Sequence, residues 1–262
     1  MSQSRPFDVA CYTRSRSVSE KGVRTVVRES ALAIGVDGKS EYVIMRTPGH
    51  DRELALGFLF SEGMIHAVSD VTMLMECPDA PGAITVRTTL AGSVVERNLV
   101  VNSSCGLCGR ADLESLLRSL PEAEGDFRLD PSVLYGVPQA VRKAQTLFTE
   151  TGGTHAAALF DRSGRIVAVR EDVGRHNALD KVIGHALLTG GRMNEMGAFL
   201  SGRASLEMIV KAARARIPLV AAVSAPTDAA VDAARRLGIT LCGFVRGDEI
   251  TVYSREDRLC AT

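Results

Sequence analysis

The pair of cysteines in Cys105-Gly-Leu-Cys108 is the most concentrated set of reactive side chains in the sequence. Two serines precede it, Gly109 follows it, and it lies between an expected strand and an expected helix. Backbone N–H groups and the dipole at the start of a helix favour a thiolate, which is the nucleophilic form of cysteine. The motif is compatible with a redox dithiol, half of a zinc site, a sulfur carrier, or two inert thiols in a turn.

Zinc is not expected as an intrinsic metal of this chain. A structural zinc site needs four nitrogen or sulfur ligands, usually from two such motifs. The other four cysteines are isolated, and no pair of histidines with ligand spacing accompanies them. A site shared by two chains is the alternative. A thioredoxin-like dithiol would follow the first strand of a βαβ unit, whereas this motif closes a mostly antiparallel segment, so nothing specific supports redox chemistry.

A second cluster of polar residues, Arg170-Glu-Asp-Val-Gly-Arg-His-Asn177, lies between an expected strand and an expected helix. Such junctions face the ends of a sheet, where ligands bind. Glu171, Asp172, Arg175 and His176 are therefore candidates for acid–base or ligand-orienting groups. The alternative is a helix cap, with Asp172 at the start of the helix, the charges solvated, and His176 on the first turn.

Two further turns, Ser201-Gly-Arg203 and Ala225-Pro-Thr227, also connect a strand to a helix. If their strands are parallel, both turns open on the same edge of the sheet. A helix N-terminus beside an arginine binds anions, so the two turns indicate a phosphate-bearing ligand, with Ser201 and Arg203 as candidate cofactor-binding residues.

A third group follows a late strand and contains an arginine, a glycine and two carboxylates. Its residues are Phe244, Val245, Arg246, Gly247, Asp248 and Glu249. Carboxylates suit recognition of a guanine edge or of ribose hydroxyls, and the alternative is a plain hairpin turn. The sequence has neither the Rossmann G-x-G-x-x-G pattern nor a Walker loop.

The elements that must position these residues differ between the two halves of the chain. In the N-terminal half, the first ten to twenty residues are expected to be loosely held. Asp37-Gly38 predicts a hairpin, and Asp51 is the expected N-cap of a helix. Strands are expected over 24–29, 31–36, 42–46, 73–76, 83–88 and 94–101, with a second helix directly after the cysteine motif.

The C-terminal half alternates strands with helices, beginning with a helix over about 131–148. This order predicts parallel neighbours and a layered α/β/α sheet with antiparallel pairs at its start and end. The acidic linker beginning at Pro121 separates an N-terminal domain, 1–122, from a C-terminal domain, 123–262. The expected fold class is α/β, with a smaller, mostly antiparallel α+β domain first.

Composition excludes several broad classes of protein. The 262 residues contain 31 basic and 31 acidic side chains, so a general nucleic-acid or membrane-surface binder is not expected. Six scattered cysteines do not form a secreted disulfide scaffold. The longest stretch without charge, Asn98–Gly109, is much shorter than the roughly 20 residues of a membrane-spanning helix, and the N-terminus has no apolar signal core. We expect a soluble, cytoplasmic protein.

With these residues in view, the chain resembles the FdhD family, the sulfurtransferase accessory proteins of formate dehydrogenase. The resemblance rests on blocks that occur in the same order along nearly the whole chain: VIMRTPGHDRELALGFLFSEGMI, SSCGLCG, TGGTHAAALF, REDVGRHNALDKVIG, FLSGRASLEMIVKAA and GFVRGDEITVYS. It implies a cytidine-deaminase-like fold for the C-terminal domain. Deaminase activity is not expected, because the zinc-binding and proton-shuttling residues of the deaminases are missing.

The resemblance also implies a role for particular residues. Cys105 would carry a persulfide received from a cysteine desulfurase, and Cys108 would assist or relay it. The sulfur would pass to a molybdenum (or tungsten) bis-molybdopterin guanine dinucleotide, contacted by Phe244–Glu249 and destined for formate dehydrogenase. A homodimer is implied as well. The alternative is a chaperone that binds and delivers this cofactor without transferring sulfur.

Overall fold

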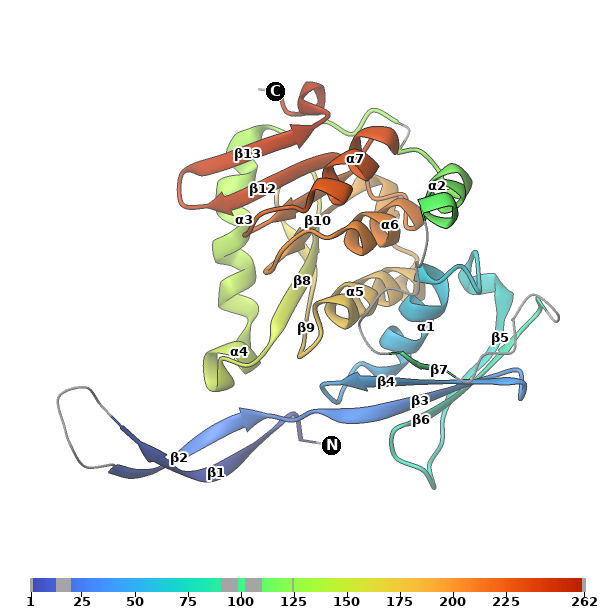
Figure 1. Cartoon of the computed structure of the whole chain (residues 1–262), viewed down its shortest axis with the longest axis vertical. Coiled ribbons are helices and arrows are strands. Elements are labelled where there is room, and N and C mark those ends of the chain that lie inside the picture. Colours follow the sequence, from blue (N-terminus) through green and yellow to red (C-terminus); the bar gives the residue numbers. More distant parts are fainter. Residues whose placement is uncertain (1, 13–19, 91–98, 102–109, 124, 261–262) are drawn as a thin grey trace.

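The computed structural model describes residues 2–12, 20–90, 99–101, 110–123 and 125–260. Two sheets with their helices form the body of the molecule, and a two-stranded arm extends from it (Figure 1). The protein therefore belongs to the α/β class. No helix in the described part of the chain is long and apolar enough to cross a membrane.

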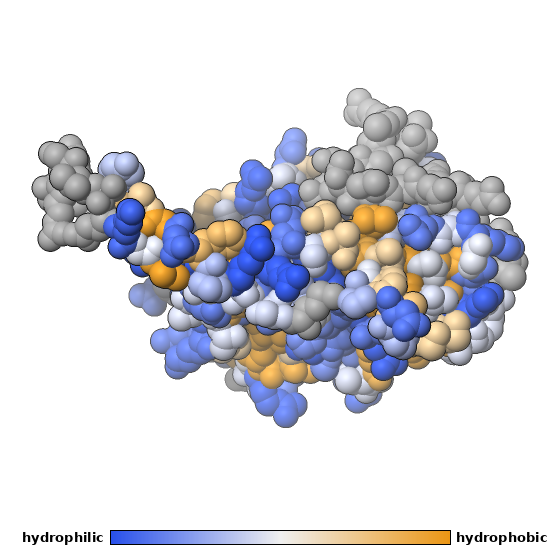
Figure 2. Space-filling model, turned by 90° about the horizontal axis from the view of Figure 1, so that it is seen from below, coloured by the Kyte–Doolittle hydropathy of each residue, from blue (hydrophilic) through white to orange (hydrophobic). Residues whose placement is uncertain are grey.

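The arm consists of β1 (Ser4–Cys11) and β2 (Glu20–Val27), which pair antiparallel from Ser4 opposite Val27 to Cys11 opposite Glu20. Figure 2 shows it projecting from the body with polar and apolar residues side by side. The expectation that the first ten to twenty residues are loosely held is therefore wrong for residues 4–11. The alternation of polar and apolar residues in this segment is too weak to predict a strand, and pairing with β2 holds the segment in an extended conformation.

The N-terminal sheet has the strand order β5-β6-β3-β4-β7 among the described residues. Its strands are β3 (Ser30–Val36), β4 (Ser40–Arg46), β5 (Val71–Glu76, preceded by the short helix η1, Val68–Asp70), β6 (Ala83–Thr88) and β7 (Leu99–Val101). The Asp37-Gly38 hairpin prediction is confirmed, and both residues have positive φ. The expected antiparallel character is only half right, because β3–β6 and β4–β7 are parallel.

Helix α1 (Asp51–Ser61) packs on one face of this sheet. Leu32, Ile34 and Ile44 of the sheet and Leu54 and Phe58 of the helix lie in one buried cluster. The expected N-cap is displaced by one residue. His50 occupies the cap position, and Asp51 instead accepts hydrogen bonds from the Arg46 guanidinium at 2.9 and 2.7 Å.

The C-terminal sheet has the order β13-β12-β11-β10-β8-β9. Its strands are β8 (His155–Phe160), β9 (Ile166–Asp172), β10 (Gly197–Leu200), β11 (Leu219–Ala222), β12 (Thr240–Arg246) and β13 (Glu249–Ser254). Strands β10, β11 and β12 are parallel, and the remaining pairs are antiparallel. The expected parallel centre with antiparallel pairs at the start and end is confirmed.

Helices cover both faces of this sheet. One core contains residues of α5 (Arg175–Thr189), α6 (Leu206–Arg214) and α7 (Asp228–Arg236), and α2 (Arg110–Ser119) also packs against it. The opposite core contains residues of α3 (Pro131–Ala144). The single helix expected over 131–148 is wrong: α3 ends at Ala144 and α4 (Thr146–Thr151) starts anew. Short helices η2 (Met193–Glu195) and η3 (Glu256–Arg258) complete the domain.

Helices α1 and α5 hold the two sheets together at very close range (Figure 1). A Cβ added at Gly57 would lie 1.8 Å from the Asp180 carbonyl oxygen, and one added at Gly184 would lie 1.9 Å from the Glu53 carbonyl oxygen. Only glycine permits this approach of two helix backbones. The boundary predicted between residues 122 and 123 stays a prediction.

Candidate functional site

The candidate site lies where the parallel strands of the C-terminal sheet end. The turns after β10 and β11 meet in a bridge between Ala204 and Pro226, and the Thr227 N–H donates to the Ala204 carbonyl at 3.0 Å. The Phe244 N–H of β12 donates to the Ser224 carbonyl at 3.3 Å. The prediction that both turns open on one edge is confirmed, since parallel strands end on the same side.

The two candidate residues of the first turn have different surroundings. The Ser201 hydroxyl accepts the Ala156 N–H at 2.8 Å, and the Ser201 N–H donates to the Ala156 carbonyl at 2.9 Å. These hydrogen bonds extend the pairing of β8 with β10 by one residue, so the Ser201 hydroxyl already accepts a hydrogen bond within the sheet. The Arg203 side chain is exposed and has no hydrogen bond or ion pair to the described residues.

The segment from Phe244 to Glu249 divides into a strained strand end and an exposed turn. Phe244 has φ 54° and is half-buried, with the Arg246 guanidinium 5.7 Å from its ring centroid. Val245 is fully buried in the core, so only its backbone can reach a ligand. Arg246, Gly247, Asp248 and Glu249 are exposed at the tip between β12 and β13.

The predicted catalytic residues Cys105 and Cys108 lie outside the described residues. The strand before them can be placed: Val101 of β7 pairs with Ile44 of β4. Strand β4 then leads through Arg46 to Thr47, which contacts the end of β9. Val101, the last described residue before the cysteines, therefore lies beside β4 two residues before Arg46.

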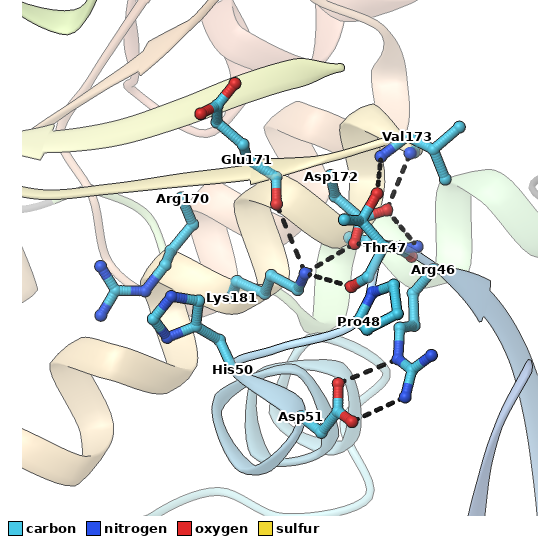
Figure 3. Close-up of polar contacts among 12 residues, drawn as sticks. Arg46, Thr47, Pro48, His50, Asp51, Arg170, Glu171, Asp172, Val173 and Lys181 are labelled. Carbon is cyan, nitrogen blue, oxygen red and sulfur yellow. Dashed lines mark hydrogen bonds and ion pairs between the residues drawn. The ribbon is translucent and has the colours of Figure 1, made fainter. Parts of the chain in front are cut away.

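At the end of β9, Asp172 is buried and paired rather than solvated (Figure 3). Its carboxylate lies 2.7 Å from Lys181 Nζ and accepts N–H groups of Thr47 and Gly174 at 3.1 and 2.8 Å. Lys181 Nζ also donates to the Thr47 carbonyl at 2.9 Å. Asp172 therefore joins the two sheets, and the expectation of a solvated capping charge is wrong.

Glu171 also has a structural role. Its carboxylate accepts the N–H groups of Leu147 and Phe148, at 2.9 and 2.8 Å, and the Thr154 hydroxyl at 2.7 Å. A carboxylate on the first N–H groups of a helix stabilises its start. This cap from β9 explains why α4 begins separately from α3, and it uses both carboxylate oxygens of Glu171 in hydrogen bonds.

Two histidines lie at the same edge. His176 lies on the first turn of α5, as the helix-cap alternative expected, and its Nε2 is 2.8 Å from Glu207 Oε2 of α6. Burial lowers the pKa of His176 and outweighs the effect of Glu207. His155, the first residue of β8, pairs across the sheet with Asp172. Burial and the Arg175 charge lower the pKa of His155. Sequence reasoning assigned His155 no role, because it opens an apolar strand.

A group of charged side chains also joins β9 and α5 to the start of α1. Arg170 donates to both oxygens of Glu53, at 2.5 and 2.7 Å, and His185 Nδ1 lies 3.0 Å from Glu53 Oε1. His50 Nδ1 is 3.3 Å from the same carboxylate. Burial raises the pKa of Glu53, but these hydrogen bonds outweigh it and hold the pKa well below its ordinary value.

Among the described residues, no three histidine, cysteine, aspartate or glutamate side chains are grouped as a metal site would require. Cys11, Cys77, Cys242 and Cys260 are free thiols. Cys242 is buried, and burial raises the pKa of its thiol to about 12. It is therefore an unreactive core residue.

Comparison with known proteins places these features in a family. The sequence model of the FdhD/NarQ family matches residues 27–260. The sulfur carrier protein FdhD of Streptomyces avermitilis is 43% identical over 250 residues, covering 90% of this chain and 89% of that protein. The protein of the same name from Thermoplasma acidophilum is 41% identical over 261 residues, covering 96% and 92%.

A solved structure shares the fold. It is described as a formate dehydrogenase accessory protein from Desulfotalea psychrophila, and it matches with a TM-score of 0.81 at 24% identity, covering 99% of this chain and 100% of that chain. At this identity the likeness concerns the fold alone. The family match and the relatives over 40% identical extend across nearly the whole sequence. This chain belongs to the FdhD/NarQ family.

Proposed function

We propose that this chain is a cytoplasmic sulfur carrier that serves formate dehydrogenase. It accepts sulfur from a cysteine desulfurase as a persulfide on Cys105, with Cys108 assisting. The observation that carries the proposal is the match, across nearly the whole chain, to relatives named sulfur carrier proteins. The Cys-Gly-Leu-Cys motif supplies the thiol chemistry that such a carrier needs.

The sulfur is passed to a molybdenum (or tungsten) bis-molybdopterin guanine dinucleotide before that cofactor enters formate dehydrogenase. The sheet edge supports this part of the proposal, because it presents Arg203 and Arg246 for phosphate groups, and Asp248 and Glu249 for guanine or ribose groups. Ser201 would contribute through its backbone, since its hydroxyl accepts the Ala156 N–H. A homodimer, in which the cysteine loop of one chain would serve the pocket of the other, is part of the proposal.

Persulfide transfer from the desulfurase to Cys105 needs neither an oxidant nor a reductant. The Cys105 thiolate attacks the outer sulfur of the desulfurase persulfide, and the desulfurase thiolate leaves, so the sulfane sulfur moves without net oxidation. In a side reaction, the Cys108 thiolate attacks the Cys105 sulfur of a stalled persulfide, which forms a disulfide between the two cysteines and releases hydrosulfide. The two thiols lose two electrons, and the sulfane sulfur gains them. A thiol reductant must then reduce the disulfide before Cys105 can accept sulfur again.

Mass spectrometry tests the proposal. The full chain is incubated with a cysteine desulfurase and cysteine, and the peptide spanning Cys105 and Cys108 is expected to gain the mass of one sulfur atom. The peptide containing Cys242 is the internal control, because a buried thiol with a pKa of about 12 does not react. No gain, or the same gain in Cys105→Ala, refutes sulfur transfer through Cys105. Cofactor binding that persists after such a result would favour the chaperone alternative.

A further inference from the structure

The arm formed by β1 and β2 has two faces, and one of them turns toward the body. Directly opposite residues of an antiparallel pair lie on the same face, and successive residues alternate between faces. Ser4 lies opposite Val27. The Ser4 hydroxyl donates to Glu150 Oε1 at 3.0 Å, and a Cβ added at Gly153 would lie 2.7 Å from Val27 Cγ1. The face with Ser4 and Val27 therefore packs against α4 and the turn that follows it.

The opposite face, called here the outward face, combines arginines with apolar side chains. Arg5 lies opposite Val26, and Phe7 lies opposite Arg24. Phe7 and Val26 are 39% and 42% exposed, and the Arg5 guanidinium is 4.5 Å from the centroid of the Phe7 ring. On each strand an arginine is two residues from an apolar side chain, a separation of about 7 Å. Positive charge and apolar surface therefore alternate along the arm (Figure 2).

The arginines of the outward face have no acidic partner in the described part of the chain. Neither Arg5 nor Arg24 forms an ion pair there, Asp8 lies on the other face opposite Val23, and Glu20 lies at the far end of the ribbon. The sequence has the same imbalance. Residues 1–28 contain six basic and two acidic side chains, although the whole chain contains 31 of each. The neutral chain therefore concentrates positive charge in the arm.

A hollow of about 340 Å³ lies at the base of the outward face. Arg5, Phe7 and Val26 line it together with Arg28. Glu29 is the one acidic residue among the described residues that line it. Two guanidinium groups beside an aromatic and an aliphatic wall suit an apolar side chain that is flanked by carboxylates.

We propose that the outward face of the arm binds an extended acidic segment of a partner protein. In an extended chain every second side chain points to one side, at intervals of about 7 Å. A segment with acidic and apolar residues in turn at those positions matches the face. Its carboxylates pair with Arg5 and Arg24, and an apolar side chain enters the hollow. The bound segment also stabilises the arm, because an isolated two-stranded ribbon is only marginally stable in water.

A distinct partner fits this face better than the same face of a second copy. If two outward faces met, Arg5 and Arg24 of one chain would lie against the basic face of the other, and like charges in contact are destabilising. The outward face uses neither the cysteine motif nor the sheet edge of the candidate site. Binding at the arm is therefore independent of the proposed sulfur transfer.

Fluorescence anisotropy of labelled peptides, added to the full chain, tests the proposal. The peptide GSESLSESLSEG has glutamate and leucine in turn on one side of an extended chain, and GSKSLSKSLSKG is its basic counterpart. The acidic peptide is expected to bind about tenfold or more tightly than the basic one. A salt concentration of about 0.15 M screens charges more than about 8 Å apart, so the measurement reports close contacts.

Variants on the two faces of the arm locate the binding surface. Arg24→Glu should weaken binding of the acidic peptide by about tenfold or more, because it replaces an attraction with a repulsion. Lys21→Glu is the matched control, since it makes the same charge change in the same strand on the face with Val27. Val26→Thr keeps the β-branched shape and should weaken binding several-fold, whereas Val23→Thr on the other face should not.

Several results overturn the proposal. They include wild-type protein that binds neither peptide, and equal weakening by Arg24→Glu and Lys21→Glu. A particle mass in sedimentation equilibrium that changes in Arg24→Glu assigns the face to a second copy of the chain. Binding to phosphatidylcholine vesicles that contain phosphatidylserine, without binding to the acidic peptide, assigns it to a lipid surface. Circular dichroism checks folding, and Val26→Thr against Val23→Thr carries the same test if Arg24→Glu disturbs the arm.

Discussion

A single substitution in the buried pair of Lys181 and Asp172 should strongly lower the unfolding free energy. Both side chains are 0% exposed, and their charged atoms are 2.7 Å apart. Lys181→Met keeps the length of the side chain but removes the ammonium group. The Asp172 carboxylate then keeps its N–H donors from Thr47, Gly174 and Asn177 but has no cation.

The size of the effect follows from burial. Removing one partner of a buried ion pair costs about 3–5 kcal/mol, because the other charge remains uncompensated. The total unfolding free energy of a domain is about 5–15 kcal/mol, so Lys181→Met should remove a large share of it. The exposed pair of Arg118 and Glu114 is the control. Its side chains are 72% and 54% exposed, and Arg118→Met should cost less than about 1 kcal/mol.

Equilibrium urea denaturation, followed by circular dichroism, measures the change in unfolding free energy. The double variant Asp172→Asn with Lys181→Met should be more stable than Lys181→Met alone, since it leaves no buried charge unpaired. A loss of unfolding free energy in Lys181→Met no larger than that in the surface control would contradict an uncompensated buried charge. A double variant no more stable than Lys181→Met alone would contradict it as well.

Two more predictions concern the same junction between the sheets. Gly184→Ala should lower the melting temperature clearly, because the added Cβ would clash with the α1 backbone. Gly136→Ala is the control, since it has open space around it and should stabilise α3 by roughly 0.5–1 kcal/mol. Equal effects of the two substitutions in thermal denaturation would contradict the close approach of α1 and α5. Glu53→Gln should reduce the loss of unfolding free energy on acidification. The folded-state pKa of Glu53 lies below its ordinary value of 4.5, so its contribution to stability is complete above pH 4.5 and is lost as the pH falls toward the folded-state pKa. An unchanged dependence of the unfolding free energy on acidic pH, measured by urea denaturation, would rule this out.

The site edge was predictable because it depends on local order. Strands that alternate with helices of ten to fifteen residues must run parallel, and parallel strands end on one side. The turns at Ser201 and Pro226 therefore had to meet, and the structure bridges them through Ala204. The family blocks are likewise properties of the sequence, and the match over residues 27–260 confirms them.

The chemical roles of the charged residues were not predictable in the same way. Asp172 resembles a solvated cap in sequence, but its partner Thr47 lies 125 residues away. Glu171 resembles an acid–base group, but it caps a helix 24 residues before it. Arg175 differs from Arg170 only in what surrounds it, and only the packed structure shows that one is paired with Glu53 and the other is not.

The sequence by itself determined the α/β class, the shared edge of the parallel strands and the family, because periodicity, turn residues and ordered motifs are local properties of the chain. The tertiary structure decided which charges are neutralised and which remain available for a ligand. The physical reason is that the energy of a charge depends on its burial and on partners that only folding brings within a few ångströms.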